Sequence, residues 1–255
     1  MQFYKYQGTG NDFIIVDNRE KTFDGDVALL CDRKFGIGAD GLMLLQMHPD
    51  YDFEMIYYNS DGKTSSMCGN GGRCLVSFAK KIGVIENQAH FLAVDGAHDA
   101  TIDTKGNVHL GMQDVPEITF YNYTDLVLNT GSPHYVKQIE NLSDLNIIAE
   151  AHAIRYHTDF SKEGINVNFI HITPGITYIR TYERGVEDET LSCGTGVTAA
   201  ALSTHQLKDK TEGTFIKTLQ TQGGKLEVKF DFTFAKGYYN IQLIGPAILV
   251  FEGDI

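Results

Sequence analysis

The sequence predicts an α+β protein built from two similar domains, and three observations support this fold class. Short segments of alternating apolar residues dominate the chain, and only four stretches have helical patterning. Strands and helices show no βαβ rhythm, which argues against a doubly wound parallel sheet. A block that contains a strand, a turn, a cysteine and a helix occurs twice, which indicates an internal duplication.

The predicted strands have apolar residues at every second position, the spacing of half-buried antiparallel strands. Segments 3–6 and 13–17 flank turn residues 8–12 and therefore predict a hairpin. On one face of segment 51–57 lie Phe53, Met55 and Tyr57. Two strands near the end share this pattern, with Leu226, Val228, Phe230 and Phe232 on the first and Tyr239, Ile241 and Leu243 on the strand that returns. Further strands are expected at 90–94, 108–112, 176–182, 214–221, 225–232 and 238–244.

Four segments have the length and composition of helices, namely 24–31, 71–82, 143–156 and 194–207. The second and the fourth matter most, because each follows a Cys-Gly-x-Gly element that begins at Cys68 or Cys193. These elements lie 125 residues apart (193 − 68), close to half of the 255 residues. We predict a first domain over 1–114, to which a strand at 246–255 returns, and a second domain over 115–245.

Composition and charge exclude several classes of protein. There are 21 basic and 33 acidic side chains, and a net charge of −12 argues against a nucleic-acid binder or a basic membrane-surface protein. The N-terminal residues lack the pattern of a signal peptide, and no apolar run approaches the length of a membrane span. We therefore expect a cytoplasmic protein. Its four cysteines form no Cys-x-x-Cys pair, so neither a zinc ribbon nor a disulfide framework is expected.

Cys68 and Cys193 each precede a predicted helix, with glycines at the loop-to-helix junction. Amide groups at a helix start carry partial positive charge, which binds carboxylates and lowers the pKa of a thiol. If the two halves face each other, one thiolate removes a proton from a carbon and one thiol returns a proton to the opposite face. The other two cysteines, Cys31 and Cys74, are interpreted as small buried apolar residues.

Other signals in the sequence are weak. Residues 36–41 only loosely match G-x-G-x-x-G and follow no strand, so they are read as a shaped loop rather than a nucleotide site. No pair among the nine histidines has a spacing that indicates a metal site. No metal and no cofactor are therefore predicted.

A series of motifs in this chain resembles those of the diaminopimelate epimerase family. They run in the family's order from residue 8 to residue 196, and are specific as a set: Gly8-Thr9-Gly10-Asn11-Asp12-Phe13, 36–41, Asn59-Ser60-Asp61-Gly62, 67–74, Gly131-Ser132-Pro133-His134, 164–169, Tyr182-Glu183-Arg184-Gly185 and Cys193-Gly194-Thr195-Gly196. The resemblance implies a cofactor-independent isomerase that interconverts LL- and meso-diaminopimelate for lysine and peptidoglycan precursors. It also implies two strand-rich β-barrels, each wrapped around a central α-helix, with the active site in the cleft between them.

The resemblance also implies roles for particular residues. Cys68 and Cys193 are the paired acid and base, with Cys193 the base toward the LL form, and His134 and Glu183 tune the thiols. The backbone amides that hold the reacting carboxylate are those of Gly69, Asn70, Gly194 and Thr195. Asn11 and Glu183 contact its ammonium group, and the distal end is held by Asn59, Asn166 and Arg184. The implied partner is this small molecule, with no nucleic acid or membrane; a homodimer is left open.

Two positions depart from the family pattern. Ser132 stands where many members have Asn, so its hydrogen bond to the distal end of the substrate is in question. Gly41 stands where some members have Gln, so no side-chain role is assigned there. The alternatives are a proline or hydroxyproline racemase, a non-catalytic amino-acid-binding protein on the same fold, and a cysteine hydrolase. A racemase usually has His at the place of Asn70, and a hydrolase leaves the second Cys-Gly-x-Gly element unexplained.

Overall fold

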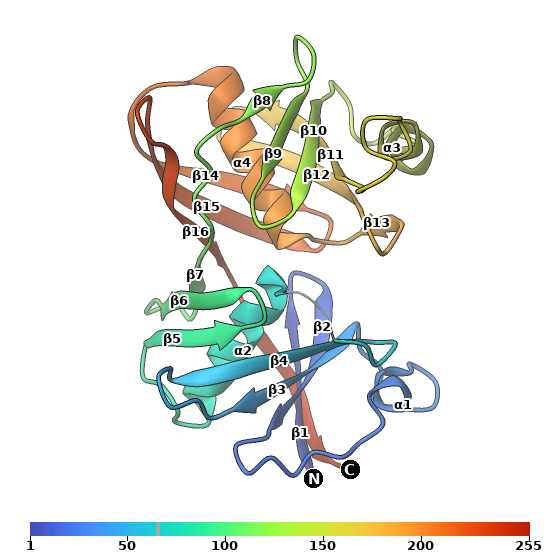
Figure 1. Cartoon of the computed structure of the whole chain (residues 1–255), viewed down its shortest axis with the longest axis vertical. Coiled ribbons are helices and arrows are strands. Elements are labelled where there is room, and N and C mark those ends of the chain that lie inside the picture. The colour runs from blue at the N-terminus through green and yellow to red at the C-terminus, as the bar shows by residue number, and fades with distance from the viewer. Residues whose placement is uncertain (65–66) are drawn as a thin grey trace. The chain divides into compact units, whose positions relative to one another are not determined.

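A computed structural model describes residues 1–64 and 67–255 of the chain. The chain divides into two compact units (Figure 1). Unit 1 comprises Met1–Gly111 and Gly245–Ile255, and unit 2 comprises Met112–Ile244. The sequence places this division after residue 114. Within the described part of the chain, no helix has the length and apolar character needed to cross a membrane.

Within its described residues, unit 1 holds one mixed sheet and two helices. Its strands are β1 (Gln2–Gly8), β2 (Asn11–Asp17), β3 (Gly41–Gln46), β4 (Phe53–Asn59), β5 (Gln88–Ala93), β6 (Gly96–Ile102), β7 (Val108–Gly111) and β17 (Ile248–Asp254). The helices are α1 (Val27–Cys31) and α2 (Gly69–Lys81). β17 pairs antiparallel with β1, and β1 forms the predicted hairpin with β2. Parallel pairs join β2 to β3 and β4 to β5, and the remaining neighbours are antiparallel.

Unit 2 repeats this order. Its strands are β8 (Thr119–Phe120), β9 (Leu126–Asn129), β10 (Pro133–Gln138), β11 (Asn166–Thr173), β12 (Ile176–Glu183), β13 (Asp188–Thr190), β14 (Gly213–Thr221), β15 (Gly224–Thr233) and β16 (Gly237–Gly245). The helices are α3 (Ile147–Arg155) and α4 (Gly194–Lys208). Parallel pairs join β10 to β11 and β12 to β14. The arrangement of hairpins and crossovers is therefore the same in both units.

The expected absence of a βαβ rhythm is wrong. Each helix lies in a crossover between two parallel strands: α1 connects β2 to β3, α2 connects β4 to β5, α3 connects β10 to β11, and α4 connects β12 to β14. The rhythm is hard to see in the sequence because an antiparallel hairpin separates successive crossovers and α1 has only five residues. The predicted architecture of two similar strand-rich domains is nevertheless confirmed.

The long helix of each unit is buried on almost every side, as expected for a helix inside a curved sheet. Ten of the 13 residues of α2 and 11 of the 15 residues of α4 are buried. Helix α2 contacts β1, β2, β3 and β7, and α4 contacts β9 to β12, β14 and β15. Each sheet therefore wraps around its own long helix and fixes the position of the helix N-terminus (Figure 1).

Two details differ from the predicted elements. Helices α1 and α3 begin later than expected, at Val27 and Ile147, because Asp26 and Asn146 cap them by accepting hydrogen bonds from backbone N–H groups of the first turn. In β16 the sequence predicts Tyr239 on the same face as Ile241 and Leu243, and this is wrong. The left-handed backbone of Asn240 (φ 50°) and a register shift opposite it leave Tyr238 buried instead.

Candidate active site

Cys68 and Cys193 occupy the same position in their two units. Each is the N-cap residue of the long helix, with backbone angles of −109° and 122° for Cys68 and −119° and 116° for Cys193. In the described structure neither sulfur accepts a capping hydrogen bond from its own helix. Gly69 and Asn70 form the first helical residues after Cys68, and Gly194 and Thr195 do so after Cys193. Both thiols therefore lie beside the positive end of a helix dipole.

In unit 1, Asn11 brings the β1–β2 hairpin to the start of α2. The Cys68 Sγ lies 3.6 Å from the Asn11 Oδ1, and the Asn70 Nδ2 donates to the same oxygen at 3.5 Å. Thr9 and Gly10 form the hairpin turn with positive φ values of 50° and 87°. Such values are unusual for threonine, so the tight turn that presents Asn11 is held under local strain.

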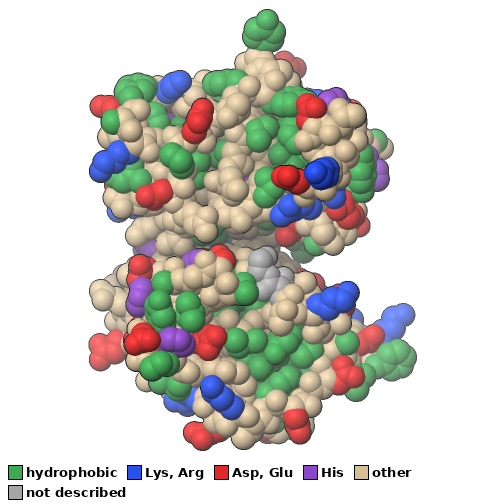
Figure 2. Space-filling view, in the orientation of Figure 1, with side chains coloured by type: hydrophobic (Ala, Val, Ile, Leu, Met, Phe, Trp, Pro, Cys, Tyr) green, Lys and Arg blue, Asp and Glu red, His purple; other side chains and the backbone are tan. Residues whose placement is uncertain are grey.

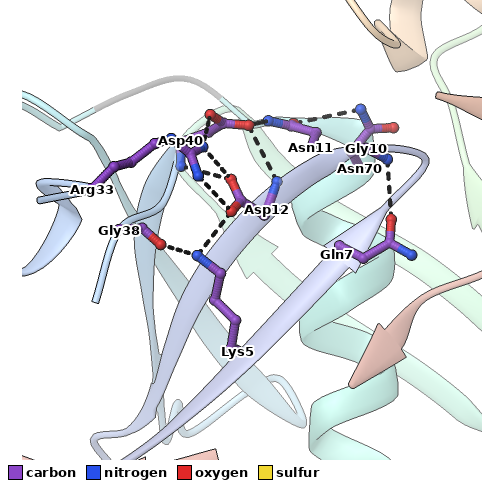
Figure 3. Close-up of polar contacts among 9 residues, drawn as sticks. All are labelled: Lys5, Gln7, Gly10, Asn11, Asp12, Arg33, Gly38, Asp40 and Asn70. Carbon is purple, nitrogen blue, oxygen red and sulfur yellow. Dashed lines mark hydrogen bonds and ion pairs between the residues drawn. The ribbon is translucent and has the colours of Figure 1, made fainter. Parts of the chain in front are cut away.

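Behind Asn11 lies a network of four charged side chains that the sequence analysis missed (Figure 3). Asp12 forms ion pairs with Lys5 at 2.8 Å and with Arg33 at 2.7 Å, and Arg33 also pairs with Asp40 at 2.7 Å. Burial alone raises the pKa of Asp12, but hydrogen bonds from Arg33 and Lys5 lower it to about 2. Asp40 then accepts a hydrogen bond of 2.5 Å from the Asn11 Nδ2.

Arg73 is a second residue that the sequence analysis left without a role. Its side chain is completely buried, and among residues 1–64 and 67–255 no carboxylate forms an ion pair with it. The guanidinium donates to the Asn70 Oδ1 at 3.0 Å, to the Gly69 carbonyl at 3.3 Å and to the Thr9 hydroxyl at 3.4 Å. Burial lowers the pKa of Arg73, and interactions with Cys74 and Cys68 act in the opposite direction.

In unit 2, Cys193 lies at the start of α4, and the first turn of this helix contacts the loop before β10. Its Sγ lies 3.4 Å from the Thr195 hydroxyl oxygen. The Thr130 hydroxyl donates to the Thr195 carbonyl at 2.9 Å, which joins the loop that carries Gly131 and Ser132 to the first turn of the helix. The sequence elements 131–134 and 193–196 are therefore neighbours within this unit.

His134 is fully buried on β10, and its ring orientation is fixed by Asn168 on β11. The Asn168 Nδ2 lies 3.0 Å from the His134 Nδ1 and 3.1 Å from the Tyr135 carbonyl. The Thr181 hydroxyl donates to the Asn168 Oδ1 at 3.0 Å. Burial, together with the charge of Arg184, lowers the pKa of His134 to about 3. His134 is therefore neutral near pH 7, with Nδ1 as the acceptor and the proton on Nε2.

Asn166 connects three of the predicted site segments. Its Nδ2 donates to the Ser132 hydroxyl at 2.8 Å and to the Pro133 carbonyl at 3.1 Å, while its Oδ1 accepts from the Arg184 backbone N–H at 2.8 Å. The Arg184 side chain is exposed and donates to the Glu163 carbonyl at 2.8 Å. Ser132, Asn166 and Arg184 thus form one connected group in unit 2.

The turn that carries Glu183 and Arg184 is supported by Glu187, another residue that the sequence analysis missed. Its carboxylate accepts hydrogen bonds from Arg155 at 2.8 Å and from the hydroxyls of Tyr156 and Tyr182 at 3.1 Å each. The Glu187 backbone N–H donates to the Glu183 carbonyl at 2.8 Å. Nothing in the sequence indicates this support, because Arg155 lies 32 positions away in α3.

Asn59 and Gly41 lie opposite each other at the paired ends of β4 and β3. Asn59 is exposed, and its backbone closes a turn with Gly62 and Lys63. A Cβ on Gly41 would lie 2.5 Å from the Tyr58 carbonyl oxygen and 2.6 Å from the Tyr57 ring. The backbone of this chain therefore has no room for a glutamine side chain at this position.

The interpretation of Cys31 and Cys74 is confirmed, because both are buried. Burial raises the pKa of the Cys31 thiol to about 11 and that of the Cys74 thiol to about 12. Both thiols are therefore protonated near neutral pH and are poor nucleophiles.

Comparison with solved structures defines the class of fold. A PhzF-family phenazine biosynthesis protein of Bacillus anthracis matches with a TM-score of 0.77 at 12% identity, over 100% of this chain and 98% of that chain. A probable proline racemase of Agrobacterium radiobacter matches with a TM-score of 0.68 at 15% identity, over 100% of this chain and 92% of that chain. The chain thus has the two-domain fold that these proteins share.

Sequence comparison identifies the family within this class. The model of the diaminopimelate epimerase family matches residues 3–116 and 126–249. The diaminopimelate epimerase of Flavobacterium psychrophilum is 51% identical over 261 residues, which cover 100% of both chains. This chain belongs to the diaminopimelate epimerase family, a family of isomerases, as its motifs indicate.

Proposed function

We propose that this chain interconverts LL- and meso-diaminopimelate by proton transfer involving two thiols, Cys68 and Cys193. The observation that carries the proposal is the matched position of these cysteines at the N-termini of the two long buried helices. A binding protein needs only the amides of the helix ends, and a hydrolase needs only one nucleophile. Two equivalent thiols suit a reaction that removes a proton from one face of a carbon and delivers one to the other.

The proposed step balances without an added oxidant or reductant. A thiolate takes the α-proton, so a carbon–hydrogen bond breaks and a sulfur–hydrogen bond forms. The second thiol gives its proton to the opposite face, so the α-carbon is inverted and the two cysteines exchange their protonation states. The α-carboxylate is held by the backbone amides of Gly69, Asn70, Gly194 and Thr195, which also stabilise the carbanion-like transition state. The proposal requires both thiols to reach one α-carbon.

Polar side chains then select the substrate. In the proposal, Asn11 and Glu183 contact the ammonium group at the reacting end, and the distal end is held by Asn59, Ser132, Asn166 and Arg184. The hydrogen bonds of Asn166 to Ser132 and to the Arg184 backbone support a preassembled distal site. Arg184 provides a planar guanidinium suited to a carboxylate.

His134 and Glu183 are proposed to tune the thiols. Because the pKa of His134 is lowered to about 3, this ring acts as a neutral hydrogen-bond donor through Nε2 rather than as a cation. We place the reaction in the cytoplasm, whose reducing conditions keep both thiols active. Its product serves lysine and peptidoglycan precursor synthesis, and the homodimer stays an open prediction.

A test compares turnover of LL-diaminopimelate and of L-proline by the purified protein. We expect turnover of the first only, and its complete loss in Cys68→Ala and in Cys193→Ala. Cys31→Ala is the matched control, because this cysteine is buried in the apolar cluster around α1 of unit 1 and its variant should keep nearly full activity. Turnover of proline alone would identify a proline racemase. Stoichiometric binding of diaminopimelate without turnover would identify a non-catalytic binding protein.

A further inference from the structure

We infer that Asp40 and Arg73 are positioning residues that orient two side-chain amides beside Cys68. The amides belong to Asn11 and Asn70, which are linked by a hydrogen bond of 3.5 Å. Asn11 lies between Asp40 and Asn70 (Figure 3). The inference deepens the proposed function, on which its consequence for substrate binding rests.

Asp40, Asn11, Asn70 and Arg73 form a row of hydrogen-bonded side chains. At the Asp40 end of this row the direction is fixed, because an ionised carboxylate only accepts hydrogen bonds. Its Oδ2 faces the Asn11 side chain at 2.5 Å and the Asp12 backbone N–H at 3.2 Å, while its Oδ1 faces Arg33 at 2.7 Å. Only the amide nitrogen of Asn11 can face this oxygen. The Asn11 Oδ1 must then point the other way, toward the start of α2.

The Arg73 end is fixed by the opposite rule, because a guanidinium only donates hydrogen bonds. Arg73 is completely buried, and its NH2 group lies 3.0 Å from the Asn70 side chain. The Asn70 atom that faces it must be Oδ1, so the Asn70 Nδ2 turns toward Asn11. A cation at one end and an anion at the other thus impose the same direction on both amides. The row of hydrogen bonds between them is therefore polarised along its length.

The direction of the Asn11 amide determines which of its atoms faces the Cys68 thiol. The Asn11 oxygen, 3.6 Å from Sγ, accepts from the thiol and so favours the protonated form. A reversed Asn11 amide would donate to the thiolate and favour it instead. In the proposed reaction the same oxygen attracts the substrate ammonium, whereas a reversed amide would present N–H groups to a cation. Asp40 therefore acts through Asn11 on both the thiol and the substrate.

The test measures the pH at which alkylation of Cys68 by iodoacetamide is half-maximal, followed by mass spectrometry of the Cys68 peptide. Asp40 is suited to substitution, because its side chain is 41% exposed, whereas buried Arg73 is needed for packing. In Asp40→Ala the released Asn11 amide can donate to the thiolate. We expect the midpoint to fall by about one pH unit. Asp17→Ala, which removes another ion-paired aspartate of unit 1, should leave it unchanged.

A double-mutant cycle separates positioning from the loss of a charge near Cys68. Arg73 and Cys74 also interact electrostatically with this thiol, and both stay in place in every variant. In an Asn11→Ala background, Asp40→Ala should no longer shift the midpoint. An equal shift with and without Asn11, or no shift in the single variant, would overturn the inference. Because alkylation needs no turnover, this result stands apart from the outcome of the epimerase assay.

Discussion

Gly196 occupies the third position after Cys193, as Gly71 does after Cys68. Both glycines lie in a helix, where alanine normally stabilises by about 0.5–1 kcal/mol. A Cβ on Gly196 would lie 2.6 Å from the Asn168 Oδ1, whereas the nearest atom to a Cβ on Gly71 is the Met43 sulfur at 3.1 Å. Methionine is flexible and can move aside. Gly196→Ala and Gly71→Ala therefore form a matched pair, in which the first should be destabilising and the second nearly neutral.

The cost of Gly196→Ala follows from the hydrogen bonds of Asn168. This side chain bonds to Tyr135, His134 and Thr181, each at 3.0–3.1 Å. Displacing it weakens two or three bonds worth about 1 kcal/mol each, for a loss of about 2–3 kcal/mol. After the gain in helix propensity, the free energy of unfolding should fall by about 1–2 kcal/mol.

Urea denaturation of the two variants and the unsubstituted protein measures this difference. Gly71→Ala should lie within about 0.5 kcal/mol of the unsubstituted protein, since the helix gain offsets a small displacement of Met43. If Gly196→Ala were as stable as Gly71→Ala, Asn168 would not be held against α4 as described. The reasoning about the fixed ring of His134 would then fail with it.

Three other predictions concern pH, the distal site and oxidation. The folded-state pKa of His134 is lowered from 6.5 to about 3, so the unfolded chain takes up a proton first as the pH drops, and the free energy of unfolding should fall between these two pH values. His134→Gln should remove this part of the pH dependence in urea titrations. An unchanged pH dependence would contradict a buried neutral ring. Arg184→Met should lower kcat/KM for diaminopimelate by about 10- to 100-fold, the cost of a lost charge-assisted hydrogen bond, and an unchanged value would remove Arg184 from the distal site. Diamide, a two-electron thiol oxidant, should join Cys68 to Cys193 in a disulfide as the two thiols lose their protons. Activity should be lost, and dithiothreitol should restore it. Peptide mapping that finds this oxidation unaffected by bound substrate would argue against two thiols flanking one carbon.

Local patterns predicted most of the fold. The alternation of Leu226, Val228, Phe230 and Phe232 is matched by burial of all four, and both long helices begin within two residues of their predicted starts. The prediction of which β16 residues are buried is wrong at Tyr239, because a register shift depends on the neighbouring strand β15. The parallel crossovers were not predicted, because strands that pair but lie far apart in the sequence leave no local signal.

The site was predicted where its residues stand in short motifs, as Cys68 and Cys193 do. The residues that hold those motifs in place were missed. Asp40 reaches Asn11 across 29 positions, and Arg155 reaches Glu187 across 32. Arg73 was visible in the Cys68 motif, but only the folded structure shows that a charged side chain there is fully buried. Tertiary contacts, rather than residue type, reveal these supporting roles.

The most direct test of the two-thiol proposal follows hydrogen exchange during turnover of LL-diaminopimelate in deuterated water. Two thiols that act on opposite faces should give meso product with one deuterium, at the inverted α-carbon, while LL-substrate recovered early carries far less label. Mass spectrometry counts the deuterium atoms in each recovered stereoisomer, and the loss of α-proton intensity in the proton NMR spectrum shows that the label lies at an α-carbon. Early LL-substrate labelled as fully as the product, or meso product without deuterium, would contradict the transfer of a proton between Cys68, substrate and Cys193.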